Sequence, residues 1–519
     1  MAIRFGAKDK SNKPKKIVGR LRKAQLITTF GNGAIANMPD YSIIIAGSNY
    51  WNPRSPKINE PNLERMLRVN HFKEPLVSDS QDNIIKPDIP AFRFPYFHFC
   101  PKCGLLMPYW NFGSEGKRFC KKGHAKTNIV PTRFMAACVN GHLEDFPYDW
   151  WVHNGNFKNC PAEKREGHLR MIFSDNTGGL DHIVIKCTAC EKTRTMAGCM
   201  HKDALKGYHC RGKRPWLGSK FEHNDPVACT AQLRTTQRDA SNVYFSLTAS
   251  ALTIPPWSNK LHQNINAQWE HLEPILNSTP DPTFLLKSLI PVYFKDFLQN
   301  YEVDEILSEI MKIFHKDTTI KYTKQNLFED EYKVFCVGDY DREDDSQFKI
   351  VRSTVPDFLK DFIDDIVMAK RLREVLALRG FRRLIPEAPD SEDSRFNGYH
   401  IDGDCVPLSD EKLNWLPAIE MLGEGIFIRL NENKLHSWET ENDHHYSQMK
   451  QRLNKSNLEI ENFSARYVLL HTLSHLLIRQ ISLECGYSSA ALKERIYSTY
   501  RSRRKTPPFR AGDVRRNFC

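Results

Sequence analysis

CPKCGLLMPYWNFGSEGKRFCKKGH, residues 100–124, is the stretch that decides the fold in the middle of this 519-residue chain. Its CxxC turn places two thiolates, Cys100 and Cys103, on one metal ion, and Cys120 and His124 follow about seventeen residues later. Four such ligands close a tetrahedron, so the spacing predicts a zinc-ribbon-like site with a structural role. The alternative is a disulfide between Cys100 and Cys103.

A second pair of ligands follows in Cys138-Val-Asn-Gly-His142, with His153 and Cys160 downstream. In one interpretation these four side chains form a second Cys2His2 site. In the other, Cys138 replaces His124 in the first site, and the remaining three are ordinary packing and surface residues.

A further CxxC motif, Cys187-Thr-Ala-Cys190, fixes two ligands of another site, which we expect Cys210 and Cys229 to complete. Cys199 is then left over, and we expect it to be a small, buried hydrophobic side chain. The three motifs together predict two or three structural Zn²⁺ sites.

The distribution of cysteines favours metal ligation over disulfides. Ten of the fourteen cysteines lie between Cys100 and Cys229, together with eight histidines. The first residues lack the apolar core of a secretory signal, and no apolar run has the length that spans a membrane. We therefore expect a cytoplasmic protein whose paired thiols bind metal, with no membrane association.

The net charge of +12 is concentrated in three parts of the chain. Residues 1–23 carry nine Lys/Arg against one Asp, residues 501–519 carry seven against one, and residues 100–230 carry twenty against twelve Asp/Glu. Basic side chains near aromatic ones suit a polyanion such as DNA, although terminal charge runs are also often merely solvated. The candidate DNA-binding residues are Lys13, Lys15, Lys16, Arg20, Arg22, Lys23, Lys213 and Arg214.

Hydrophobic patterning predicts a multidomain α+β protein with a zinc-ribbon-like central region and a helical segment. Apolar residues at three- and four-residue spacing predict helices over 284–314, 357–381 and 462–486, the last closed by Gly486. Strands are expected over 242–257 and 423–430. The expected parts are a basic, disordered arm (1–23), a β-rich segment and connector (24–95), the zinc-binding region (96–235), a mostly helical segment (236–400), a C-terminal α/β domain (401–500) and a basic tail (501–519).

The pattern His471-Thr-Leu-Ser-His475 is the one feature that favours a catalytic rather than a structural metal site. The i, i+4 spacing puts both imidazoles on one helix face, with Glu484 or a more distant acid to complete a set. The catalytic Glu of an HExxH motif is replaced by Thr472, and packing inside an apolar helix is the commoner role of such histidines.

Several blocks of the sequence, taken in order from about residue 22 to about residue 500, resemble the DrmB subunits of the DISARM phage-defence system. They are QLITTFGNGAIANMPDYSIIIAG (25–47), PTRFMAACVNGHLEDFP (131–147), CRGKRPWLG (210–218), LRTTQRDASNVYF (233–245), RLREVLALRGF (371–381), WLPAIEMLGEGIFIRL (415–430) and LHTLSHLLIRQISLECG (470–486). The resemblance implies a helicase-associated zinc-binding domain, like that at the end of MrfA-type helicases. It also implies that the C-terminal α/β domain is incomplete, since family members continue with strands and a further cysteine cluster.

What the resemblance implies about function is a non-motor subunit that partners a large DrmA-type helicase and helps it engage foreign DNA. No G-x-x-x-x-G-K-[ST] phosphate loop occurs in the chain, so we expect no motor activity, no catalytic residue and no small-molecule substrate. Two alternatives remain open: a metal-dependent hydrolase or nuclease using His471 and His475, and a protein-interaction scaffold without DNA contact.

Overall fold

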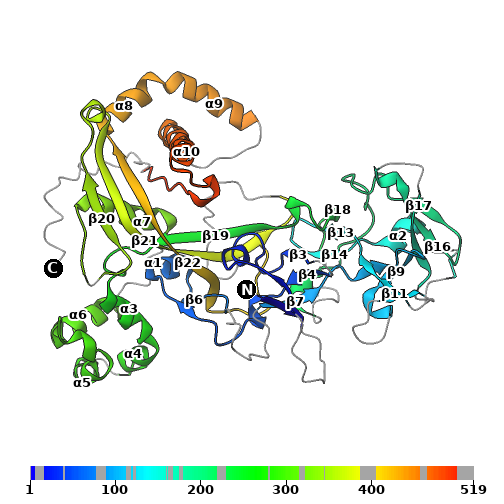
Figure 1. The fold of residues 1–519 in the computed structure, drawn as a ribbon, viewed down its shortest axis with the longest axis horizontal. Helices are drawn as coiled ribbons and strands as arrows, with labels where there is room; N and C mark the ends of the chain where they lie inside the picture. The colour runs from blue at the N-terminus through cyan, green and yellow to red at the C-terminus, as the bar shows by residue number, and fades with distance from the viewer. Residues whose placement is uncertain are drawn as a thin grey trace.

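The computed structural model describes residues 2–5, 17–38, 41–76, 89–112, 119–120, 124–158, 160–161, 167–174, 179–218, 229–278, 281–314, 322–343, 345–385, 405–455 and 464–498. It confirms a multidomain protein of mixed helices and sheets. The molecule is elongated, with the cysteine-rich region at one end (Figure 1). The other end holds two groups of helices beside a long β-hairpin (Figure 1).

A five-stranded sheet forms the N-terminal part, in the order β2-β1-β7-β4-β3. Its strands are β1 (Ala2–Phe5), β2 (Ile17–Arg20), β3 (Ile35–Met38), β4 (Tyr41–Ile45) and β7 (Ile89–Arg93). Ile43 and Ile45 of β4 pack into one core and Ile44 into another, so both faces are covered and the run of three isoleucines is explained. Strands β1 and β2 fall in the segment expected to be a disordered arm, but both pair into this sheet.

A second, long sheet runs through the molecule in the order β19-β21-β22-β6-β5, with β20 paired to β21. Its strands are β5 (Lys57–Ile58), β6 (His71–Lys73), β19 (Phe245–Leu252), β20 (Lys349–Ser353), β21 (Ile363–Arg382) and β22 (Trp415–Leu430). The strands expected over 242–257 and 423–430 are confirmed as β19 and as part of β22.

The helix predicted over 357–381 is wrong, because β21 is a twenty-residue strand. Buried residues such as Val367, Ala369, Val375 and Ala377 alternate along it, which is the period of a strand. β21 pairs with β22 along one edge and with β19 and β20 along the other. These long-range pairings satisfy its backbone groups on both edges and override the helical spacing of the apolar residues.

Helices occupy the stretch between β19 and β20. They are α3 (Lys260–Ala267), α4 (Trp269–Leu276), α5 (Thr283–Tyr293), α6 (Val303–Phe314) and α7 (Lys324–Val337). The predicted helix over 284–314 is confirmed, as the pair α5 and α6, with Leu286 and Ile290 packing against Ile306 and Ile310. Helix α7 packs instead on the long sheet, beside α1 (Pro61–Leu67).

The C-terminal part consists of β22 and three helices, α8 (Glu432–Glu441), α9 (Asp443–Lys455) and α10 (Ala465–Cys485). Helix α10 confirms the helix predicted over 462–486. Ser464 caps its first turn by accepting from the Tyr467 amide, and Gly486 ends it in the left-handed conformation at φ 73°. Among the described residues, no helix is both long and apolar enough to cross a membrane. Residues 501–519, the basic tail, lie outside the described residues.

In the described residues, the cysteine-rich region contains three small sheets and one short α-helix. The largest has the order β12-β8-β9-β15-β16-β17, comprising β8 (Phe97–Phe99), β9 (Leu105–Pro108), β12 (Val130–Pro131), β15 (Leu169–Phe173), β16 (Ile183–Cys187) and β17 (Thr193–Thr195). The others are β10 (Phe119–Cys120) with β11 (His124–Asn128), and β14 (Leu143–Asp145) with β13 (Phe134–Ala137) and β18 (Arg234–Gln237). Helix α2 (Tyr148–His153) packs on this region.

Candidate metal centres

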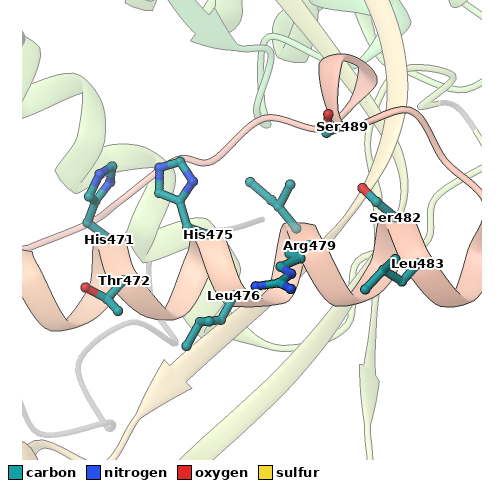
Figure 2. Close-up of a pocket in the computed structure, with 9 residues that line it drawn as sticks. His471, Thr472, His475, Leu476, Arg479, Ser482, Leu483 and Ser489 are labelled. Carbon is teal, nitrogen blue, oxygen red and sulfur yellow. The ribbon is translucent and has the colours of Figure 1, made fainter.

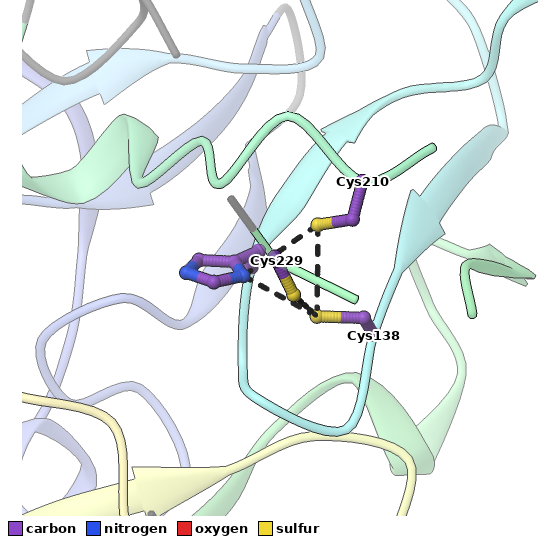
Figure 3. Close-up of side chains that lie close together, drawn as sticks. Cys138, Cys210 and Cys229 are labelled. Atoms are coloured by element: carbon purple, nitrogen blue, oxygen red, sulfur yellow. Dashed lines mark hydrogen bonds between the residues drawn. The ribbon is translucent and has the colours of Figure 1, made fainter. Parts of the chain in front are cut away.

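One of the three thiol clusters in the described residues, named cluster C here, unites Cys138, His142, Cys210 and Cys229. Figure 3 shows how its three cysteines lie. The sulfur of Cys138 lies 3.8 Å from that of Cys210 and 3.9 Å from that of Cys229. His142 Nδ1 lies 3.4 Å from the Cys138 sulfur and 3.5 Å from the Cys210 sulfur. All four donor atoms therefore face one common point.

Local sequence explains how cluster C is presented. Cys138 and His142 lie at the two ends of the tight turn between β13 and β14, where the Cys138 amide donates to the His142 carbonyl at 3.2 Å. Gly141 adopts φ +80° in this turn, a conformation that favours glycine. A Cβ at Gly141 would lie 1.8 Å from Val406 Cγ2, so the turn also needs glycine for space. The amide of Gly212 donates to the Cys210 sulfur at 3.5 Å.

Cluster B unites His153, Cys160, Cys187 and Cys190. The Cys160 and Cys187 sulfurs are 3.7 Å apart, and the Cys190 sulfur lies 3.4 Å from His153 Nε2. The other ring nitrogen of His153, Nδ1, donates to the carbonyl of Asp149 at 2.7 Å. That bond fixes the ring orientation and leaves Nε2 with its lone pair toward the sulfurs, which is the usual arrangement of a metal-binding histidine.

Cluster A unites Cys100, Cys103 and Cys120. Cys103 and Cys120 are 3.7 Å apart, sulfur to sulfur. The CxxC turn closes through a bond from the Gly104 amide to the Cys100 carbonyl at 2.8 Å, with Gly104 at φ +69°. The predicted fourth ligand, His124, pairs its backbone with Cys120, but its side chain lies outside the described residues.

The structure combines the predicted ligands differently from the expected grouping. The Cys138–His142 pair joins Cys210 and Cys229. One interpretation of the sequence placed this pair with His153 and Cys160, and the other placed Cys138 in the first site. His153 and Cys160 instead complete the site of the second CxxC motif, Cys187 and Cys190. Cys199 belongs to none of the three clusters and is fully buried, as expected of a spare cysteine.

The donor geometry fits zinc, and no disulfide is found among the described cysteines. All thirteen cysteines that the structure describes are free thiols, and the sulfur pairs in the clusters are 3.7 to 3.9 Å apart, far beyond a disulfide bond of about 2.05 Å. Two sulfurs bound tetrahedrally at about 2.3 Å from one Zn²⁺ lie about 3.8 Å apart, and a sulfur and an imidazole nitrogen lie about 3.6 Å apart. Clusters B and C match both separations, and cluster A matches the first.

Two thiols of cluster C shift each other's pKa in opposite directions. The hydrogen bond from Cys210, with further help from His142, lowers the pKa of Cys138 to about 4. The same bond, together with burial, raises the pKa of Cys210. One thiolate is thus stabilised at the expense of its neighbour, whereas a shared divalent cation would stabilise all of them together.

The candidate DNA-binding residues of the sequence are scattered. Lys23 pairs with Glu74 at 2.7 Å, and Arg20 and Arg22 are exposed beside it in the chain. Lys13, Lys15 and Lys16 lie outside the described residues, and Lys213 and Arg214 are half-buried. Burial raises the pKa of Glu144, and the charge of nearby Lys213 opposes that shift.

In the fold a carboxylate lies beside His471 and His475, but it is not that of Glu484, the acid that the sequence suggested first. Glu484 bonds the side chain of Gln480 on the same helix. Glu494, in the segment that follows α10, lies beside both histidines instead. Sequence spacing offered no signal for this contact, because Glu494 comes from outside the helix.

Two comparisons with known proteins cover the region that holds the three clusters. A family described as a domain of unknown function (DUF8724) matches residues 22–245, which include all three clusters. The DISARM protein DrmB of Bacillus paralicheniformis (strain ATCC 9945a / NCIMB 11709 / CD-2) is 31% identical over 484 residues, covering 88% of this chain and 80% of that protein. An alignment of this length and identity, which spans the cluster region and the long sheet alike, establishes common descent. The chain therefore belongs to the family of the DISARM protein DrmB.

Proposed function

We propose that this chain is a zinc-stabilised, non-motor subunit of a DISARM-type antiphage defence system, in which it partners a large DrmA-type helicase and helps it engage foreign DNA. The observation that carries the proposal is the similarity to a DISARM protein along nearly the whole chain. The cysteine clusters, and the lack of a phosphate loop in the sequence, support a subunit that binds and positions other molecules.

Zinc in this proposal has a structural role. Clusters B and C each offer four ligands, so no coordination position is left for a substrate. Cluster B ties α2 to the end of the β16 strand, and cluster C ties the β13–β14 turn to the chain before β18. Because the sites require the folded chain, the free energy of metal binding contributes directly to folding.

The proposed DNA-binding surface includes the loop between Cys199 and Cys210. Lys202, Lys206 and Arg211 are exposed on or beside this loop, which successive turns and the burial of Cys199 hold in place. Arg211 lies over the ring of Tyr208, 5.3 Å from its centroid. Cations beside an aromatic ring can neutralise phosphates while a base stacks, as in single-strand binding surfaces.

Co-expression with a large DrmA-type helicase tests the proposal. We expect the two full-length proteins to co-purify, and the complex to bind DNA more tightly than the helicase alone at moderate salt. A complex that forms without any gain in DNA binding would support a scaffold instead. Failure to co-purify would refute the helicase partnership, provided that the chain itself is folded and metal-loaded.

A further inference from the structure

We propose that His471, His475 and Glu494 form a binding site for a divalent transition metal ion, separate from the three thiolate clusters. The donor atoms of these residues lie within 4.8 Å of one another. Nothing in this inference depends on the role in defence proposed above.

The two imidazoles stand one turn apart on α10 and face the same side of the helix (Figure 2). Their ring centroids are 4.4 Å apart. His471 Nδ1 lies 2.8 Å from Glu494 Oε1, and His475 Nε2 lies 3.9 Å from the same oxygen. Ligands about 2.1 Å from one cation are separated by about 3.0 to 3.4 Å, so the observed distances bracket the value that a bound ion would impose.

The contact between His471 and Glu494 is not an ordinary hydrogen bond. The Nδ1 atom of His471 is shielded from solvent and makes no hydrogen bond within the described part of the chain, although the carboxylate oxygen is only 2.8 Å away. The two atoms are close but poorly aligned with each other. Such an arrangement suits two donors whose lone pairs converge on a third atom.

Glu494 is positioned independently of the histidines. Its neighbours in the chain are both anchored elsewhere, because Lys493 bonds Glu374 at 3.1 Å and Arg495 bonds the buried Glu331 at 2.6 Å. The side chains of Lys493 and Arg495 are therefore paired with carboxylates other than that of Glu494. The hydroxyl of Ser474 contacts the second carboxylate oxygen, Oε2, and leaves Oε1 for the imidazoles.

The site is open to solvent on one side. A cavity of about 630 Å³ adjoins it, between α10 and the segment that passes over it (Figure 2). Its walls include His471, Thr472, His475, Ser482 and Ser489. Three protein ligands leave further coordination positions facing this cavity, for water or a small anion. Two imidazoles and one carboxylate are donors that suit Zn²⁺ and its neighbours in the first transition series.

Calorimetric titration with Zn²⁺ tests the site in full-length protein whose thiolate clusters are already filled. We expect the wild-type chain to bind one further equivalent. His475→Ala and Glu494→Gln should each weaken that binding by at least about tenfold. The second variant keeps the shape of the side chain, so it remains informative if the first disturbs α10.

A matched control removes two histidines that belong to none of the groups of donor atoms described here. His444→Ala/His445→Ala, in α9, should bind the further equivalent as the wild type does. An unaltered affinity in Glu494→Gln, or no uptake by the wild-type chain, would overturn the proposal. In either case the contact between His471 and Glu494 is only an ion pair.

Discussion

Arg383 Nε donates to the carbonyl oxygen of Gly141 at 3.0 Å, which joins the end of the long strand β21 to the turn that carries cluster C. The same guanidinium donates to the carbonyls of Val243 and Gly33. The Arg383 side chain is almost fully buried, at 1% exposure. One side chain thus connects the backbone before β3 of the N-terminal sheet, the cluster C turn of the cysteine-rich region and the backbone before β19 of the long sheet.

Replacing Arg383 by Met should destabilise the protein by about 3 kcal/mol or more, because three buried carbonyl groups lose a charged donor at once. Urea unfolding followed by fluorescence measures this cost. Arg382→Met is the control, since Arg382 is only half-buried at the end of β21. A loss below about 1 kcal/mol for Arg383→Met would show that water replaces these bonds.

Gly141→Ala should destabilise the cluster C turn, since the new Cβ meets Val406 and the backbone has φ +80°. Adding Val406→Ala should recover the part of the cost that comes from the clash, and leave about 1 kcal/mol from the backbone conformation. A double-mutant cycle in thermal unfolding measures the coupling. Strictly additive effects would refute the close approach of Gly141 and Val406.

Cys187→Ser and Cys199→Ser should differ in metal content. Cys187 belongs to cluster B, so its replacement should lower the zinc content by about one ion per chain. Cys199→Ser places a hydroxyl in a buried apolar site and should cost about 1 to 3 kcal/mol while the metal content stays unchanged. Elemental analysis of purified protein distinguishes them. Equal metal content in both variants would argue against Cys187 as a ligand.

Alkylation should reveal three classes of cysteine. Exposed Cys485 should react with iodoacetamide first. The nine cysteines of the clusters should react only after a strong chelator has removed the metal. Cys199 should react last, because burial raises the pKa of its thiol to about 12 and the thiolate is the nucleophile. Peptide mass spectrometry measures the order. Reaction of the cluster cysteines before chelation would count against bound metal.

Charge reversal of Lys202, Lys206 and Arg211 should weaken DNA binding and flatten its dependence on salt, because each lost phosphate contact removes a released counterion. The control reverses Lys295, Lys450 and Arg452, which are also exposed but lie far from the clusters in the chain. Electrophoretic mobility shifts at several salt concentrations measure both effects. Equal loss in both triple variants would mean that only the net charge of the protein matters.

The sequence predicted the local features of the metal centres but not how they combine. A CxxC motif closes its own turn, so Cys100–Cys103 and Cys187–Cys190 could be recognised from spacing alone. The grouping of the pairs depends on how the small sheets associate. Pairing of β13 with β18 brings the Cys138–His142 turn toward the chain before β18, where Cys229 lies. Linear order in the sequence suggested a different partner.

The long strand β21 is a second feature that the local sequence pattern did not predict. Its apolar residues recur at spacings that also suit a helix, and Arg and Leu are good helix formers. Strands far away in the chain, β19 and β22, supply the partners that decide its conformation. Helix α10 was predicted because its apolar residues recur at helical spacing and Gly486 marks its end locally.

Native mass spectrometry of the reduced, folded His471→Ala/His475→Ala variant tests most directly whether sulfur and imidazole groups bind metal in the cysteine-rich region. The mass of the native protein should exceed that of the denatured chain by three zinc ions, one for each cluster. Equal native and denatured masses, with intact free thiols and a folded spectrum, would contradict the account.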